Sequence, residues 1–148
     1  MRLEVTRKSD LATKAMIEMH RLGRRAKAAE LAELVGTSSG FLSQVLTPLV
    51  ARGWVRSEPG PTGGYSVTID LDDLNVLQVI EAVEGPTDSG RCVLEDRTCS
   101  DSTPCVMHKP WQRARSQMLG ELREIPLSTL TSEALSKAVP PKTSGKSE

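Results

Sequence analysis

The sequence predicts a mainly α-helical protein with one small β-hairpin and a long helix toward its C-terminal end. Apolar residues recur at intervals of three and four in several segments, which is the period of an amphipathic helix. A glycine- and proline-rich segment, residues 59–64, separates two short stretches with the character of strands. With 148 residues, of which 38% are hydrophobic, the chain can form one compact domain with an extended arm.

The first helices are expected in the basic N-terminal part of the chain, where Lys and Arg outnumber Asp and Glu. Ser9 or Asp10 is the candidate cap of a first helix that ends at Leu22. A second helix is expected over residues 26–35 and a third over residues 39–52.

The hairpin and two more helices follow. Strands are expected over residues 54–58 and 65–69, and Asp70 or Asp72 is the candidate cap of a fourth helix that ends before Gly85. Trp111, Ala114, Met118 and Leu122 fall at helical spacing and predict a long amphipathic helix over residues 110–124. A last short helix is expected after Leu127.

Residues 28–47, with the sequence AAELAELVGTSSGFLSQVLT, have the spacing of a helix-turn-helix. Leu31 and Val35 would bury the first helix, Gly36 permits the turn, and Leu42 and Val45 would bury the second. Followed by a hairpin, this pattern predicts a winged helix-turn-helix that binds double-stranded DNA. The alternative is a helical hairpin with a small ribbon and no role in DNA binding.

In such a domain the third helix would lie in the major groove, where Gln44 could form two hydrogen bonds with adenine. Basic residues would supply sequence-independent attraction to phosphates, and glycines would let the hairpin tip approach the DNA closely. The candidate DNA-binding residues are Ser38, Ser39, Phe41, Ser43, Gln44, Arg24, Arg25, Arg56, Gly60, Gly63 and Gly64.

All three cysteines lie in one polar, acidic segment, CVLEDRTCSDSTPCVMH, which lacks a regular hydrophobic period. No stretch of about 18 uncharged apolar residues is present, and the sequence starts without a signal-peptide pattern, so we expect a cytoplasmic protein with no membrane partner. In a reducing compartment, three clustered thiols indicate a metal site or redox chemistry better than a disulfide scaffold.

Cys92, Cys99 and Cys105 would be soft thiolate ligands, which suit an iron-sulfur cluster or zinc. His108 could be the fourth ligand, since it would lie on the same side as Cys105 if Cys105 begins the last long helix. Asp10 is the alternative, provided by a second subunit. Structural zinc sites usually pair cysteines at shorter spacing, so the wide spacing here favours a cluster.

With these features in place, the chain resembles the Rrf-type winged-helix regulators, the family that includes IscR and NsrR. The motifs that carry the resemblance are MRL, LTPLVARGWV, PGPTGGY, LNVLQVIEAVEGP and the three cysteines followed by HKPW. The resemblance implies a homodimer held by the long helix around Trp111, Met118 and Leu122. It also implies a palindromic operator and an iron-sulfur cluster that tunes DNA affinity.

Two branches of the family are represented. His108 after Cys105, with Trp111 following, resembles the IscR pattern and implies a 2Fe-2S cluster bound by His108. Asp10 resembles the NsrR pattern, which implies a 4Fe-4S cluster that nitric oxide destroys. One departure is Pro59, which stands where the family wing commonly has arginine.

The expected function is therefore a cluster-dependent transcriptional regulator, usually a repressor, and not an enzyme. A regulator whose cysteines bind zinc or act as a thiol switch is the main alternative, and an iron-sulfur redox enzyme is the least favoured. The expected regions are a winged helix-turn-helix (residues 1–86), a cluster-binding loop (87–108), a dimerisation helix with a short final helix (109–135) and a disordered tail (136–148).

Overall fold

A computed structural model of the chain describes residues 4–130. The main elements are α1 (Arg7–Leu22), α2 (Ala28–Val35), α3 (Ser39–Ala51), β1 (Val55–Glu58), β2 (Gly64–Val67), α4 (Val76–Glu84) and α5 (His108–Arg123). Single 3-10 turns are η1 (Leu71–Asp73) and η2 (Leu127–Thr129). The predicted class, mainly helical with one hairpin and a long last helix, is confirmed.

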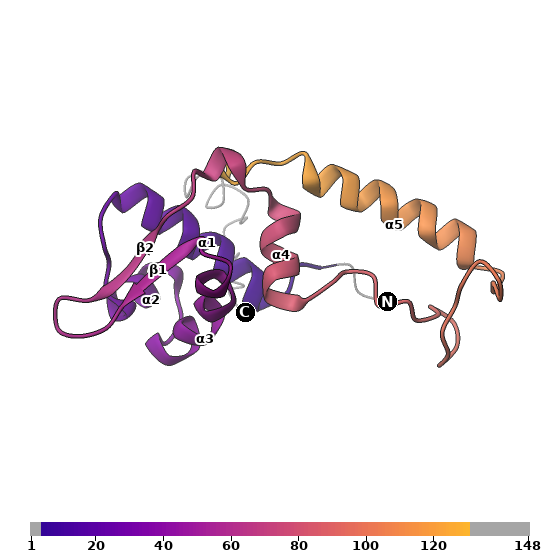
Figure 1. Ribbon diagram of the computed structural model, residues 1–148, viewed down its shortest axis with the longest axis horizontal. Helices are drawn as coiled ribbons and strands as arrows, with labels where there is room; N and C mark the ends of the chain where they lie inside the picture. The colour runs from indigo at the N-terminus through magenta and orange to yellow at the C-terminus, as the bar shows by residue number, and fades with distance from the viewer. Residues whose placement is uncertain (1–3, 131–148) are drawn as a thin grey trace, which may run out of the picture.

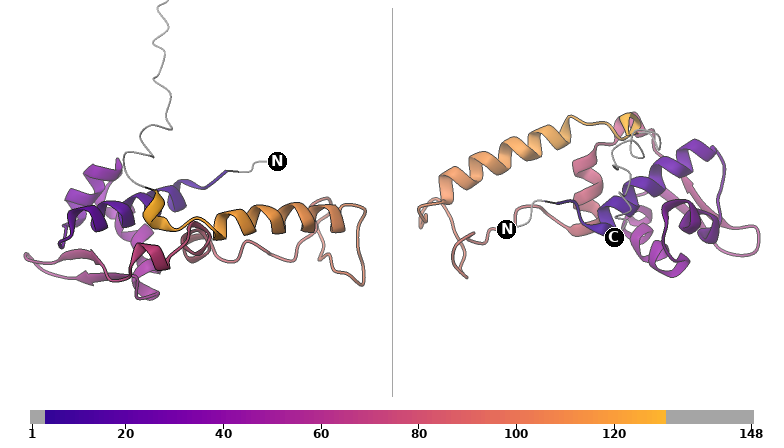
Figure 2. Two further views of the ribbon diagram at one scale, coloured as in Figure 1. Left: turned by 90° about the horizontal axis from the view of Figure 1, so that it is seen from above. Right: turned by 180° about the vertical axis from the view of Figure 1, so that it is seen from behind.

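The elements form two regions (Figure 1). The head comprises residues 4–84 and 124–130 and contains α1 to α4, the hairpin and η2. The arm comprises residues 85–123 and contains the cysteine segment and α5. Figure 2 shows from two further sides that α5 extends away from the head, with the cysteine segment at its far end.

Helix α1 begins earlier than predicted. Its N-cap is Thr6, whose side-chain oxygen accepts a hydrogen bond from the backbone N–H of Ser9 over 3.3 Å. Ser9 is fully buried and donates its hydroxyl to Glu84, so it lies inside the helix instead of capping it. The prediction of Ser9 or Asp10 as the cap was therefore wrong, although the end of the helix at Leu22 is confirmed.

Helices α2 and α3 form the predicted helix-turn-helix. Their axes are bent by 98° across the turn, within the range usual for the motif, and Gly36 takes the left-handed conformation with φ 74°. The side chain of Ser38 caps α3 by accepting from the N–H of Phe41. Within residues 4–130 no single helix is long and apolar enough to span a membrane, and only α2 and α3 taken together pass on length and composition.

The hairpin is shorter than predicted. Its antiparallel register pairs Val55 with Val67 and Glu58 with Gly64. Ala26 forms an additional bridge with Tyr65, in which the N–H of each donates to the carbonyl of the other over 2.9 and 2.8 Å. Because Ala26 is extended in this bridge, α2 begins at Ala28 and not at residue 26.

Helix α4 has a cap that the sequence prediction missed. Asn75 and Gln78 form a reciprocal capping box, with both side chain to backbone hydrogen bonds at 2.9 Å. Asp70 caps the preceding 3-10 turn instead, by accepting from the N–H of Asp72. The prediction of Asp70 or Asp72 as the cap of α4 was therefore wrong.

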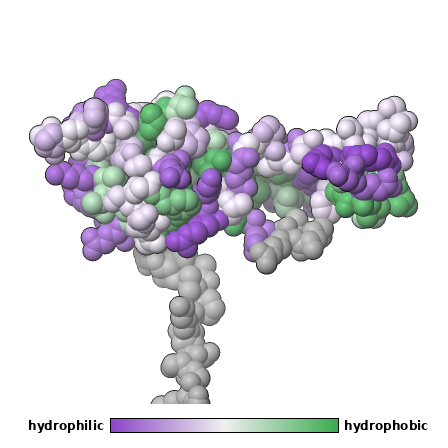
Figure 3. All heavy atoms as spheres, turned by 90° about the horizontal axis from the view of Figure 1, so that it is seen from below, coloured by the Kyte–Doolittle hydropathy of each residue, from purple (hydrophilic) through white to green (hydrophobic). Residues whose placement is uncertain are grey.

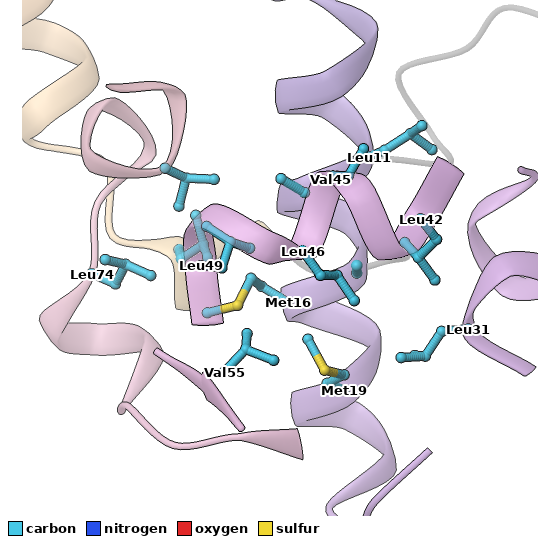
Figure 4. Close-up of a cluster of buried hydrophobic side chains, with 14 of the residues drawn as sticks. Leu11, Met16, Met19, Leu31, Leu42, Val45, Leu46, Leu49, Val55 and Leu74 are labelled. Carbon is cyan, nitrogen blue, oxygen red and sulfur yellow. The ribbon is translucent and has the colours of Figure 1, made fainter. Parts of the chain in front are cut away.

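The core of the head lies where α1, α3 and the start of α4 meet (Figure 4). Met16, Leu31, Leu42, Leu46 and Leu49 are completely excluded from solvent. Figure 4 shows the methionine and leucine side chains converging from α1, α2 and α3. This core belongs to the head alone, with no contribution from α5 beyond the half-buried Leu122 at its C-terminal end.

The chain returns to the head after α5. Leu127 is fully buried and donates its backbone N–H to Leu74 over 2.7 Å, and the N–H of Val76 donates to Ile125. The predicted short helix after Leu127 is the single 3-10 turn η2. The predicted tail, residues 136–148, lies outside the described residues.

Candidate metal centre and nucleic-acid interface

The three cysteines come together at the far end of the arm. The sulfur atoms of Cys92, Cys99 and Cys105 all lie within 4.8 Å of one another, and all three thiols are free and half-buried. The segment that carries them has no regular helix or strand. Backbone hydrogen bonds shape it instead: Cys92 donates to Arg97, and Cys99 donates to Gly90, over 2.9 and 3.1 Å.

The three thiols have different surroundings. The backbone N–H of Leu94 donates to Cys92 Sγ over 3.5 Å, and this hydrogen bond lowers the pKa of the Cys92 thiol. Loss of solvation, together with hydrogen bonding to Cys92, raises the pKa of the Cys105 thiol. Cys92 is therefore converted more readily than Cys105 to the thiolate, the form that binds metals.

His108 lies beside the sulfur group. Its side chain is only 6% exposed, with Nδ1 at 3.1 Å from Cys99 Sγ and Nε2 at 3.1 Å from Asp101 Oδ1. Cys105 does not begin α5, as the sequence interpretation required; α5 begins at His108, whose N–H donates to the Cys105 carbonyl. The imidazole nevertheless lies next to a thiol, because the turn from Cys105 directs it inward.

Asp101 is a residue that the sequence prediction missed. Metal-binding histidines commonly hold their second nitrogen in a hydrogen bond with a carboxylate, and Asp101 is placed for that role. An acid two residues after a cysteine was the available signal. Asp10 lies in α1 of the head and bonds to Lys14 over 2.8 Å, and it is not part of the sulfur group of its own chain.

The donor set fits a soft metal centre. Three thiolates and one imidazole suit zinc or an iron-sulfur cluster, whereas magnesium and calcium prefer oxygen ligands. The residues present therefore match the groups predicted from the sequence. Cys92, Cys99 and Cys105 would hold the centre, with His108 adjacent.

The predicted DNA-binding residues on α3 fall into two groups. Ser38, Ser39 and Gln44 are exposed, with Ser38 also serving as the N-cap. Phe41 packs partly against the core, and Ser43 accepts from the hydroxyl of Tyr65 over 3.2 Å. The exposed side chains on this face of α3 are therefore centred on Ser39 and Gln44.

Two of the three candidate arginines around the hairpin have acidic partners. Arg24 pairs with Glu30 at 2.5 Å and Arg25 pairs with Glu58 at 2.6 Å, while Arg56 is exposed on β1. Arg25 therefore contacts the hairpin directly, and Arg56 is part of it.

The hairpin glycines differ in role. Gly60 is exposed with open space around it, as a close approach to DNA requires. Gly63 is buried, and a Cβ there would overlap the Glu58 carbonyl; a Cβ at Gly64 would overlap the Ala26 carbonyl. Gly63 and Gly64 are therefore required by packing inside the wing, and their role in the approach to DNA stays a prediction.

Comparison with known proteins decides the family. The model of the Rrf2 family, described as an iron-dependent transcriptional regulator, matches residues 5–133. The chain belongs to the Rrf2 family. Its function is the regulation of transcription, and the hairpin is the wing of a DNA-binding winged helix, as the sequence predicted.

Curated Rrf2-family relatives carry the name IscR. The chain is 31% identical over 130 residues to the HTH-type transcriptional regulator IscR of Photobacterium profundum. The matched residues cover 86% of this chain and 75% of that protein. It is 30% identical over 130 residues to the IscR of Photorhabdus laumondii, with 86% and 79% covered.

Solved Rrf2-family structures share the fold. The T. potens IscR structure has a TM-score of 0.68 at 22% identity, with 93% of each chain covered. The structure of CymR, the global cysteine regulator of B. subtilis, also has a TM-score of 0.68, at 21% identity, with 94% of this chain and 100% of that chain covered.

Proposed function

We propose that this Rrf2-family regulator binds an iron-sulfur cluster through Cys92, Cys99 and Cys105. The observation that carries the proposal is the convergence of three free sulfur atoms within 4.8 Å in a loop without a hydrophobic core. The names of the IscR relatives and the iron dependence in the family description support it. When bound, the cluster would supply a centre whose redox state, or loss to oxidants, nitric oxide or iron shortage, is the signal.

For the fourth ligand we favour His108 over Asp10. His108 Nδ1 already lies 3.1 Å from Cys99 Sγ in the same chain, whereas Asp10 would have to leave Lys14 and come from a second subunit. An imidazole ligand accords with the 2Fe-2S expectation, and a carboxylate from the second subunit accords with 4Fe-4S. The nuclearity therefore depends on which of these two residues binds.

The arm supports a homodimer. A groove of about 660 Å³ between α4, α5 and the cysteine segment is lined by Leu77, Ile80, Trp111, Met118 and Leu122, among others. Helix α5 buries none of its apolar side chains fully, and a 16-residue helix in that state is marginal in water. We propose that α5 of a second copy fills the groove, because a two-fold contact brings the same apolar face from both chains.

In such a dimer the two heads would meet a palindromic operator. The two recognition helices, α3 of each copy, must be about 34 Å apart to enter successive major grooves. The arm carries both the dimer contact and the cysteines, so the state of the centre would alter the spacing of the heads. A differential free energy of about 1 to 3 kcal/mol suffices for a switch, and repression of transcription is the expected output.

One alternative has support in the same geometry. Three thiols this close could bind one zinc ion with His108, or two of them could form a disulfide as a thiol switch. In either alternative the protein would still bind DNA as a dimer, and only the group formed at the three cysteines would differ.

The test is native mass spectrometry of anaerobically purified protein, with iron, sulfide and zinc analysis. We expect a dimer with 2Fe-2S per chain that is lost in Cys99→Ala and in His108→Ala and kept in Asp10→Ala. Ser102→Ala, in the same loop, is the matched control. Zinc without iron would establish the zinc alternative. A 4Fe-4S cluster that depends on Asp10 would show that the fourth ligand is Asp10, provided by the second subunit.

A further inference from the structure

The turn of the wing, with the residues that flank it, carries no positive charge of its own; Arg56 lies further back on β1. Residues 57–64, SEPGPTGG, contain one acid, Glu58, and neither Lys nor Arg. Phosphate groups repel an acidic side chain, so a wing that approaches DNA requires this carboxylate to be neutralised. In the structure the group that neutralises it comes from another part of the head.

Arg25, in the loop between α1 and α2, contacts both sides of the wing turn. Its Nη2 lies 2.6 Å from Glu58 Oε2, at the end of β1, and its Nη1 donates to the Thr62 carbonyl over 3.1 Å. The planar guanidinium suits two simultaneous hydrogen bonds, because its donors point in fixed directions. One side chain therefore joins the two sides of a turn that also has a backbone hydrogen bond from the Gly63 N–H to the Gly60 carbonyl.

The backbone beside Arg25 is attached to the same strand. Ala26 exchanges two hydrogen bonds with Tyr65, at 2.9 and 2.8 Å. Gly64 allows this approach, because a Cβ there would lie 3.2 Å from Arg25 Cγ and would overlap the Ala26 carbonyl. Residues 25 and 26 thus lie beside β2, where Ala26 forms an antiparallel bridge with Tyr65.

We infer that Arg25 is the positioning residue of the wing. It neutralises Glu58 and fixes the turn so that the exposed Gly60 faces the DNA, and its effect on affinity comes through the wing and not through a phosphate contact of its own. The inference deepens the DNA-binding part of the proposed function. Its first test is made without DNA or metal, so failure of the cluster proposal leaves it intact.

The first measurement is amide hydrogen exchange in the free protein, followed by NMR. In Arg25→Ala we expect the Gly63 amide, which donates to Gly60, to exchange at least about tenfold faster than in the wild type. Arg21→Ala is the matched control: Arg21 is also exposed and paired, but its partner Glu18 lies in α1 and not in the wing. Equal Gly63 exchange in both variants and the wild type would overturn the inference.

The second measurement is affinity for a DNA duplex recovered from a random pool by the wild-type protein. Arg25→Ala should weaken binding by about tenfold, and Arg25→Lys, which keeps the charge but cannot hold both partners, should show loss of affinity together with fast Gly63 exchange. Wild-type affinity in Arg25→Lys despite fast exchange would show that Arg25 acts as a phosphate contact, and the positioning role would be abandoned.

Discussion

The head and the arm differ in what their side chains are buried against. In the head, Leu31, Leu42, Leu46 and Leu49 are excluded from solvent by side chains of the same region. In α5, His108 is the one buried residue among those described, and it is buried beside cysteines. The head can therefore be stable by itself, whereas in the proposed function the arm would be stabilised by a second chain and a bound centre.

The arm also differs from the head in the apolar side chains that it exposes to solvent. Val93, Leu94, Val106 and Met107, all in the cysteine segment, leave large parts of their side chains in solvent. Figure 3 shows hydrophobic side chains gathered at the end of the arm that is furthest from the head. The arm thus presents apolar surface of the kind that interfaces cover.

The largest effect on stability is expected from the core of the head. Leu46→Ala removes a fully buried side chain from α3 and should lower the free energy of unfolding by about 2 to 5 kcal/mol. Val106→Ala, in the arm at 84% exposure, should change it by less than about 0.5 kcal/mol. Urea denaturation measures both, and similar losses in the two variants would remove the distinction between the regions.

The next effect concerns the dimer and should leave the head unchanged. Met118→Asp places a charge in the apolar groove and should raise the dimer dissociation constant about a hundredfold, roughly 3 kcal/mol. Gln117→Asp, an exposed neighbour that does not line the groove, is the control. Analytical ultracentrifugation gives the constant, and an unchanged dimer in Met118→Asp would contradict the proposed interface.

A smaller effect on stability is expected at the start of α4 in the head. Asn75→Ala removes the capping box of α4 and should cost about 1 kcal/mol of unfolding free energy. Asp72→Ala, at a position that the sequence had favoured as the cap, should cost much less, because the Asp72 side chain does not cap α4. Thermal unfolding compares the two, and a larger loss in Asp72→Ala would restore the original prediction.

The smallest effect on the free energy of unfolding is expected from a residue of the arm, and it depends on pH. The Gly90 N–H, and then Arg115, hold the pKa of Asp88 below its ordinary value of 3.8. A lowered pKa in the folded state stabilises the fold above the ordinary value and loses this effect as pH falls through the folded pKa. Asp88→Asn should therefore flatten the acid dependence of unfolding below about pH 4, by less than about 1 kcal/mol because the Asp88 carboxylate is exposed. A slope equal to that of the wild type would disprove the linkage.

Local sequence patterns were sufficient to predict most of the fold. The helix-turn-helix followed from the spacing of Leu31, Gly36 and Leu42, and the hairpin followed from the glycines and prolines between its strands. The convergence of the three cysteines was also predictable, since a short segment without regular structure holds them all. In each case the information lies within about 20 residues of chain.

Features that depend on distant residues could not be predicted. Thr6 and Ser9 are equally good caps in sequence terms, and the choice is made by Glu84, which accepts from both hydroxyls. Arg25 looked like a general basic residue until Glu58 and Thr62 were placed beside it. These outcomes rest on tertiary contacts, which override local propensity.

Leu127 has a consequence for the synthesis of the protein on the ribosome. This fully buried leucine belongs to the core of the head but follows the arm in the chain. Domains fold as units during translation, so the growing chain cannot complete the head until the cysteines and α5 have been made. A nascent chain that stops before η2 would lack a core leucine, which links a finished DNA-binding head to the presence of its sensing arm.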